Sequence, residues 1–83
     1  MKLDPKKYGL NTRTVLIENE RKEIIIVINR KSRIIMKDGR KILEKVRKIQ
    51  QQENKIISVK TNAPLCSKTK QHLQENGIEI RES

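Results

Sequence analysis

The run from Ile24 to Ile28 is the feature that most restricts the fold of this 83-residue chain. It consists only of isoleucine and valine, which favour extended backbone. Because alternate side chains of a strand point to opposite faces, both faces of this strand are apolar. Such a strand fits the middle of a sheet that is covered on two sides, or a strand that pairs two copies of the chain. We favour the central position.

Other short apolar segments predict the elements around this strand. Strands are expected over 12–18, 33–37, 55–60 and 78–81, with helices over about 39–49 and 64–74. In the first helix Asp38 is read as the N-cap, followed by Gly39 in the turn. The sequence therefore predicts an α+β (mixed α/β) fold with a small mixed five-stranded sheet in the order β-β-β-α-β-α-β. An antiparallel meander is followed by helix, strand, helix and strand.

The first eleven residues show no hydrophobic period and contain Pro5 and Gly9. They are expected to be a flexible or loosely docked arm. Residues 12–83 are expected to form a single α/β domain, which at this size buries only roughly 60 to 65% of its unfolded surface. An internal active-site cavity is not expected in so thin a core.

Positive charge is concentrated between Arg30 and Ile49. The whole chain carries a net charge of +10, and this stretch, with nine basic and two acidic residues, accounts for 9 − 2 = +7 of it. A surface with such a one-signed excess is typical of proteins that bind polyanions, above all nucleic-acid phosphates. The candidate binding residues are Arg30, Lys31, Arg33, Lys37, Arg40, Lys41, Lys45, Arg47 and Lys48.

Aromatic residues are almost absent, since the chain has no Phe, no Trp and a single Tyr, Tyr8. Modules that bind single strands by stacking bases need two or three exposed rings, so that mode of binding is excluded. A nucleic-acid surface on this chain would contact the backbone and shape of DNA or structured RNA. The alternative interpretation of the charge is a solvated surface without a partner.

The sequence offers no recognisable catalytic or metal-binding set. One cysteine and one histidine give neither a disulfide framework nor metal-ligand spacing, and the longest apolar run is far too short to span a bilayer. We therefore expect a cytoplasmic, non-enzymatic binding module without a cofactor. The alternative is a protein-interaction or regulatory subunit that associates with itself or with an acidic partner, and single-cysteine redox chemistry at Cys66 is a third possibility.

The predicted order of a meander followed by helix, strand and helix resembles the core of the restriction-endonuclease-like fold. That family's signature is an Asp at the end of one strand and Glu-x-Lys on the next, and the resemblance implies a nuclease fold. Here the corresponding strand ends in Asn29, and the next carries Ile35, Met36 and Lys37. Only Lys37 matches, so two carboxylates to hold Mg²⁺ are missing from these positions.

The segment from Ile56 to Glu79 resembles the strand, Cys-Pro-x-Cys, helix and Gly-Ile unit of glutaredoxins. Ala63 stands at the position of the first cysteine and Cys66 at that of the second, which excludes a two-thiol mechanism. A helix N-terminus would make Cys66 reactive, whereas a small buried cysteine beside Thr69 and Leu73 is the plainer expectation. His72 has no catalytic partner nearby in the sequence and is expected to be a surface residue.

Overall fold

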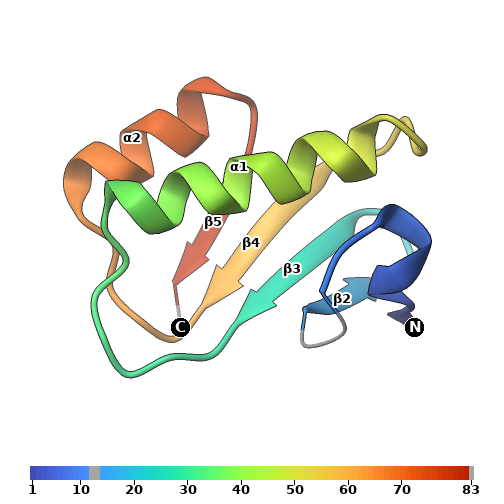
Figure 1. Ribbon diagram of the computed structural model, residues 1–83, viewed down its shortest axis with the longest axis horizontal. Helices are drawn as coiled ribbons and strands as arrows, with labels where there is room; N and C mark the ends of the chain where they lie inside the picture. The colour runs from blue at the N-terminus through green and yellow to red at the C-terminus, as the bar shows by residue number, and fades with distance from the viewer. Residues whose placement is uncertain (12–13, 83) are drawn as a thin grey trace.

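The computed structural model describes residues 1–11 and 14–82, which form a five-stranded mixed sheet with two α-helices (Figure 1). This confirms the predicted fold class, and the order β-β-β-α-β-α-β holds with β1 in place of the strand predicted over 33–37. The strands are β1 (Lys2–Leu3), β2 (Val15–Glu18), β3 (Ile24–Ile28), β4 (Ile57–Thr61) and β5 (Glu79–Glu82). The helices are α1 (Met36–Gln50) and α2 (Ser67–Glu75), and a short 3-10 helix, η1, spans Pro5–Tyr8.

The strands lie in the sheet in chain order, β1-β2-β3-β4-β5, with β3 in the centre as the apolar run predicts. The pairs β1–β2 and β2–β3 are antiparallel, and the pairs β3–β4 and β4–β5 are parallel. A parallel neighbour requires a crossover connection, and α1 and α2 supply the two crossovers. Both helices lie side by side on one face of the sheet (Figure 1).

The core lies between this face of the sheet and the two helices. Register places Ile24 opposite Ile57 and Ile26 opposite Val59, and all four side chains are buried. Helix α1 covers them with a stripe of apolar side chains at three- and four-residue spacing, which are Ile42, Leu43, Val46 and Ile49. Burial of each aliphatic side chain contributes about 1.5–3 kcal/mol, so this layer is the main source of stability.

The strand predicted over 33–37 is wrong. Ile34 forms a single parallel bridge to Leu65, and Met36 and Lys37 already belong to α1. Asp38 is therefore not the N-cap; it lies in the first turn, where its Oδ2 accepts a hydrogen bond of 3.2 Å from the backbone N–H of Ile35. A carboxylate in the first turn satisfies an unpaired N–H there, so the helix starts before Asp38 rather than after it.

The N-terminal segment, expected to be flexible, is packed against the sheet. Lys2 and Leu3 pair with β2 and thereby supply the third strand of the meander. The side chain of Tyr8 is only 3% exposed, and its hydroxyl donates a 3.2 Å hydrogen bond to Glu53 Oε1. The start of the strand predicted over 12–18, at residues 12 and 13, lies outside the described residues. The single aromatic residue in a polar segment is the sequence signal for this packing.

The second face of the sheet is not covered by any helix of residues 1–11 and 14–82 (Figure 1). Ile17 lies opposite Ile25 and Val15 opposite Val27 on this face, and Val15 and Ile17 are 36% and 37% exposed. The described elements thus cover the central strand on one side only, and the second side presents a small apolar patch.

Helices α1 and α2 approach each other closely at Gly39. A Cβ at this position would lie 2.6 Å from Thr69 Cγ2, a separation that real Cβ atoms essentially never show. Thr69 is fully buried and cannot turn away into solvent. Glycine is therefore required here by the packing of the helices and not by a turn.

The substitution Gly39→Ala should destabilise the protein. Overpacking costs about 1–3 kcal/mol, whereas alanine gains up to about 1 kcal/mol over glycine in a helix. We expect a net loss of about 1 kcal/mol or more in the free energy of unfolding, measured by urea denaturation. Adding Thr69→Ser removes the clashing methyl group and should recover much of this loss. A Gly39→Ala protein more stable than the wild type would contradict the proposed contact.

Candidate functional site

The carboxyl ends of β3 and β4 meet at one edge of the sheet, because the two strands are parallel and Ile28 lies opposite Thr61. Asn29 and Asn62 follow directly after these ends. Asn62 Nδ2 donates a 2.6 Å hydrogen bond to Asn29 Oδ1, and Asn62 Oδ1 accepts one of 3.0 Å from the backbone N–H of Arg30. Crevices beyond the carboxyl ends of parallel strands are the usual ligand sites of open α/β sheets.

Three adjoining hollows surround these strand ends, with volumes of about 290, 240 and 180 Å³. All three include Ile28 in their walls. The hollow that contains Lys60 also contains its register partner Val27, so it opens on the uncovered face of the sheet, whereas the hollow with Arg30 and Lys41 lies on the α1 side. We call the three together the strand-end groove. Its polar lining comes from Asn29, Arg30, Asp38, Lys41, Lys45, Lys60, Thr61 and Asn62, with Asn11 and Thr14 at one side.

Helix α1 places two lysines over the groove. Lys41 and Lys45 are four residues apart and so share one flank of the helix. Lys45 is half-buried and contributes to two of the hollows, and Lys41 is exposed and contributes to one. The buried stripe of α1 fixes the rotation of the helix, and this rotation directs the flank toward the ends of the strands.

Arg30 is held at the mouth of the groove by two partners. Its guanidinium lies 3.1 Å from Asp38 Oδ1, and its Nη2 donates a 2.7 Å hydrogen bond to Ser32 Oγ. The N–H of Ile35 and then the neighbouring Arg30 hold the pKa of Asp38 below its usual value. Asp38 therefore remains ionised and neutralises one of the groove's cations.

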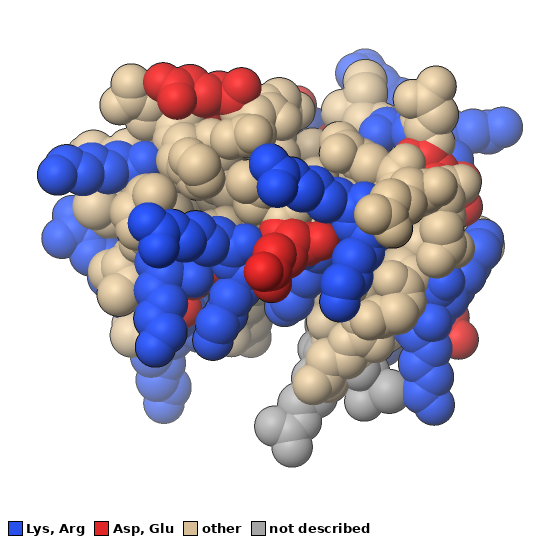
Figure 2. Space-filling model, turned by 45° about the horizontal axis from the view of Figure 1, so that its top comes forward, with Lys and Arg blue, Asp and Glu red and all other residues tan. Residues whose placement is uncertain are grey.

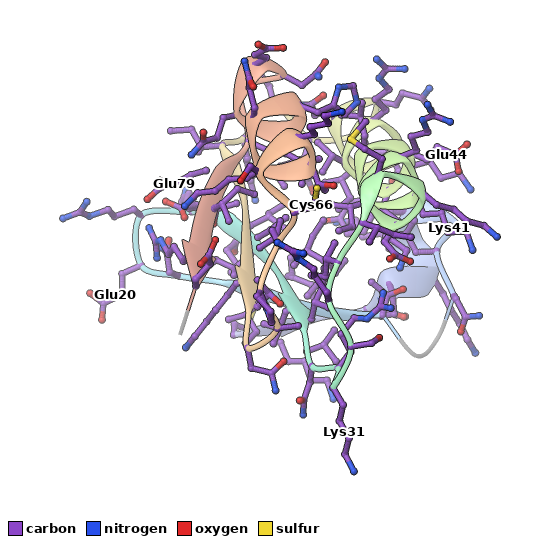
Figure 3. All side chains as sticks on the ribbon, turned by 90° about the vertical axis from the view of Figure 1, so that its left-hand side faces the viewer. Glu20, Lys31, Lys41, Glu44, Cys66 and Glu79 are labelled. Atoms are coloured by element: carbon purple, nitrogen blue, oxygen red, sulfur yellow. The ribbon has the colours of Figure 1, made fainter. Side chains whose placement is uncertain are left out.

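The other predicted cationic residues lie outside the groove. Lys37, Arg40, Arg47 and Lys48 are exposed on α1, and Figure 2 shows Lys and Arg side chains spread over the helical side of the molecule with acidic side chains between them. Lys31 points outward from the loop before α1, away from Lys41 (Figure 3). The structure thus brings together Arg30, Lys41 and Lys45 of the nine predicted residues.

Sequence reasoning missed Asn29, Lys60 and Asn62. Each lies at or just beyond the end of a strand, and their convergence depends on β3 and β4 being adjacent and parallel. An asparagine directly after each of two strands is the signal in the sequence. The signal has meaning only once the two strands are known to be neighbours.

A second polar cluster lies where β2 ends and β4 begins. Lys55 Nζ contacts Glu18 Oε2 and lies 3.7 Å from Glu53 Oε2, while Lys7 Nζ lies 3.3 Å from Glu53 Oε1. The bond from Lys7 lowers the pKa of Glu53, and the bond to Glu18 raises the pKa of Lys55. The cluster fastens the N-terminal segment to the sheet through Tyr8 and Lys7.

Glu53 and Lys55 have the Glu-x-Lys spacing, but they precede β4 instead of lying on a strand. Lys37, the residue that matches the restriction-endonuclease signature in the sequence, lies in α1. Within residues 1–11 and 14–82, no group of three or more His, Cys, Asp or Glu side chains could hold a metal ion. Nor is any helix in this described part long and apolar enough to cross a membrane.

Cys66 is not the buried residue that the sequence suggested. It is partly exposed and forms the N-cap of α2. The backbone N–H groups of Lys68 and Thr69 lower the pKa of its thiol, with a further contribution from Arg33.

Comparison with known proteins gives a likeness of fold. No protein-family model matches the chain, and no curated protein matches it by sequence. Among solved structures, a crystal structure of a repair endonuclease from Pyrococcus abyssi superposes with a TM-score of 0.67 at 15% sequence identity. The match covers 83% of this chain and 31% of the endonuclease chain, so this chain spans less than a third of that protein.

This likeness overturns the expectation of a non-enzymatic protein, because the fold is shared with part of a repair endonuclease and is therefore one that an enzyme uses. At 15% identity it shows the fold alone and assigns no residue a role. The nucleic-acid site and the alternative of a protein-interaction subunit both stay predictions at this point.

Asp38 provides a pH-dependent test of the Arg30 contact. A carboxyl group with a lower pKa in the folded chain contributes stability above its ordinary value of 3.8, and this contribution is lost as the pH falls through the folded value. The unfolding free energy of the wild type should therefore fall more steeply below pH 3.8 than that of Asp38→Asn, which keeps an oxygen for the Ile35 N–H. Urea denaturation over a pH series measures both. Parallel pH profiles would show that Asp38 is not engaged as described.

Proposed function

We propose that the strand-end groove binds the phosphate backbone of a nucleic acid. The observation that carries this proposal is the placement of Arg30, Lys41 and Lys45 around the hollows on the α1 side of the carboxyl ends of β3 and β4, with Lys60 at the same strand ends on the uncovered face. These cations come from a loop, a helix and a strand. Their convergence is a property of the fold and not of local sequence composition.

The charge of the groove supports an anionic ligand. Four basic side chains line it, and the one carboxylate among its lining residues, that of Asp38, is already paired with Arg30. Phosphates that enter such a site release their condensed counterions, which favours binding at low salt. The remaining excess on α1, within a chain of net charge +10, adds long-range attraction for a polyanion.

The neutral side chains of the groove suit contacts to a sugar-phosphate backbone. Asn29 and Asn62 are exposed and fixed to each other, so their remaining amide groups are held in place for oxygen atoms of a ligand. The groove lining contains no aromatic residue, and Tyr8, the one aromatic side chain of the chain, is buried. Recognition by backbone and shape, on a duplex or structured RNA, is the mode that these residues support.

The comparison supports the same class of partner, since the solved structure with this fold is named as a repair endonuclease. An endonuclease acts on nucleic acid, and this chain has in the corresponding fold a cationic groove at the end of its central strands. The proposal concerns contact with the backbone and assigns no residue a catalytic role.

Removal of the two lysines of α1 tests the site. The double variant Lys41→Gln, Lys45→Gln should bind labelled duplex DNA and duplex RNA about tenfold more weakly. The slope of log affinity against log salt should become shallower by about two, because about two phosphate contacts are lost. Fluorescence anisotropy with a chelator present measures binding without cleavage. Circular dichroism checks that the fold is retained.

The matched control is Arg21→Gln, Lys22→Gln, which removes the same charge at the turn between β2 and β3, at the opposite end of β3 from the groove. It should lose little affinity. Equal losses in both double variants would mean that binding follows net charge, which would contradict a defined groove. A third variant, Arg40→Gln, Arg47→Gln, tests the exposed side of α1 outside the groove.

Asp38→Asn should act in the opposite direction. It removes the acid that neutralises Arg30, so the guanidinium becomes available to a phosphate. We expect affinity for duplex nucleic acid to rise by about threefold at low salt, with a steeper salt dependence. Unchanged or weaker binding at matched ionic strength would remove Arg30 from the proposed site.

A further inference from the structure

Ser32 lies in the loop between β3 and α1, in contact with the side chain of Arg30. The residue is exposed, and its Oγ accepts hydrogen bonds from two nitrogen atoms of the Arg30 guanidinium, Nε at 3.2 Å and Nη2 at 2.7 Å. Before the serine, the Arg30 N–H donates a 3.0 Å hydrogen bond to Asn62 Oδ1. After it, the Ile34 N–H donates one of 2.9 Å to Pro64 O. The loop is thus anchored on both sides of an accessible hydroxyl group.

The loop around Ser32 is strongly cationic. Arg30, Lys31 and Arg33 surround the serine in the sequence, and Lys31 projects outward from the loop (Figure 3). Arg30 lies 3.1 Å from Asp38, whereas neither Lys31 nor Arg33 forms an ion pair in the described part of the chain. A phosphorylated serine carries a charge of about −1.5 to −2 and three strong acceptor oxygens. These cations would therefore stabilise a phosphate on the serine.

The Arg30 guanidinium already has the orientation that such a phosphate requires. Two of its nitrogen atoms point at Ser32 Oγ, and the third, Nη1, lies on Asp38 Oδ1. Arginine binds phosphate oxygens through two parallel hydrogen bonds, which the point charge of a lysine cannot do. A phosphate on Ser32 would meet both of these donors without a change in the backbone of the loop.

The other described serines lack these surroundings. Ser58 is 0% exposed, so an enzyme cannot reach it. Ser67 is exposed in the first turn of α2, but it has Leu65 two residues before it. Ser32 has Arg30 at that position. Protein kinases select substrates by charge patterns around the acceptor, and a basic residue at this spacing suits a kinase with an acidic substrate groove.

We propose that Ser32 is phosphorylated by an arginine-directed serine kinase, and that the phosphate weakens binding of nucleic acid at the strand-end groove. Carboxylates of the kinase that bind Arg30 withdraw it from the serine. Ser32 Oγ then attacks the γ-phosphorus of ATP, so that a new O–P bond forms and the bond from this phosphorus to the β,γ-bridging oxygen breaks. ADP leaves with that oxygen, and the hydroxyl proton passes to a carboxylate base of the kinase.

The effect on the groove rests on the proposed function. The hollow on the α1 side is lined by Arg30, Lys41, Lys45 and Asp38, whose charges sum to 3 − 1 = +2. A phosphate on Ser32 brings this sum close to zero, because it adds a charge of about −2 beside Arg30. It also occupies the guanidinium that would otherwise meet a phosphate of the nucleic acid. Both effects lower the affinity for a polyanion.

The phosphorylation site is tested by treatment of the full chain with an arginine-directed serine kinase and ATP, followed by intact mass spectrometry and peptide mapping. The wild type should gain one phosphate, on Ser32, and Ser32→Ala should gain none. Arg30→Gln should react about tenfold more slowly, because it removes the residue that directs the kinase. Ser67→Ala is the matched control and should react like the wild type. Phosphate on another residue, or none, would overturn the assignment.

The effect on binding is tested with phosphoserine installed at position 32 by genetic encoding. This protein should bind duplex DNA and duplex RNA about tenfold more weakly than the wild type at low salt. Phosphoserine installed at position 67, outside the groove, should weaken binding by only about twofold, because it changes the net charge alone. Equal losses in the two proteins, or no loss at position 32, would contradict the regulation.

Phosphorus NMR separates this inference from the proposed function. Contact with Arg30 should lower the second pKa of the phosphoserine at position 32 below its ordinary value of about 6, and Arg30→Gln should restore it. If the wild type binds neither duplex, the proposed function fails, while a lowered pKa still supports the phosphate site. An ordinary pKa at position 32 would overturn the contact with Arg30, whether or not nucleic acid binds.

Discussion

The parallel pairing of β3 with β4 is the constraint on which the rest of the structure depends. Its register places Ile24 opposite Ile57 and Ile26 opposite Val59, which gives both helices a continuous apolar surface to cover. The same pairing brings the two strand ends together. One set of backbone hydrogen bonds therefore determines both the core and the position of the groove.

The positions of the positive charges matter more for ligand binding than the net charge of the chain. Cations on the outer side of α1 are fully hydrated and screened by salt within roughly 8–10 Å. Lys45 is half-buried, and Arg30 is fixed by Asp38 and Ser32, so these two lose less conformational entropy when a ligand binds. A few positioned cations beside a concave surface select a ligand better than a larger number spread over a helix.

Much of the fold is predictable from the sequence, because β3 is a continuous run of isoleucine and valine, β4 alternates apolar and polar residues, and α1 has a clear hydrophobic period. The strand predicted over 33–37 is wrong because an alternation over only five residues is too short to distinguish a strand from the approach to a helix. The packing of Tyr8 is not predicted from the sequence, because its partner, Glu53, is 45 residues away in the chain. The basic residues between Arg30 and Ile49 are identifiable from the sequence by residue type. Lys60, Asn29 and Asn62 join the site only through tertiary structure, because the pairing of β3 with β4 brings them there.

The central claim is that nucleic acid contacts the carboxyl ends of β3 and β4. Titration of ¹⁵N-labelled protein with a short duplex, followed by amide chemical shifts, tests it directly because every segment is observed at once. The largest changes should lie in residues 28–30, 41–45 and 60–62, with few in the turn at 19–22. Changes confined to the outer side of α1 or to the uncovered face of the sheet, or none at low salt, would contradict the account.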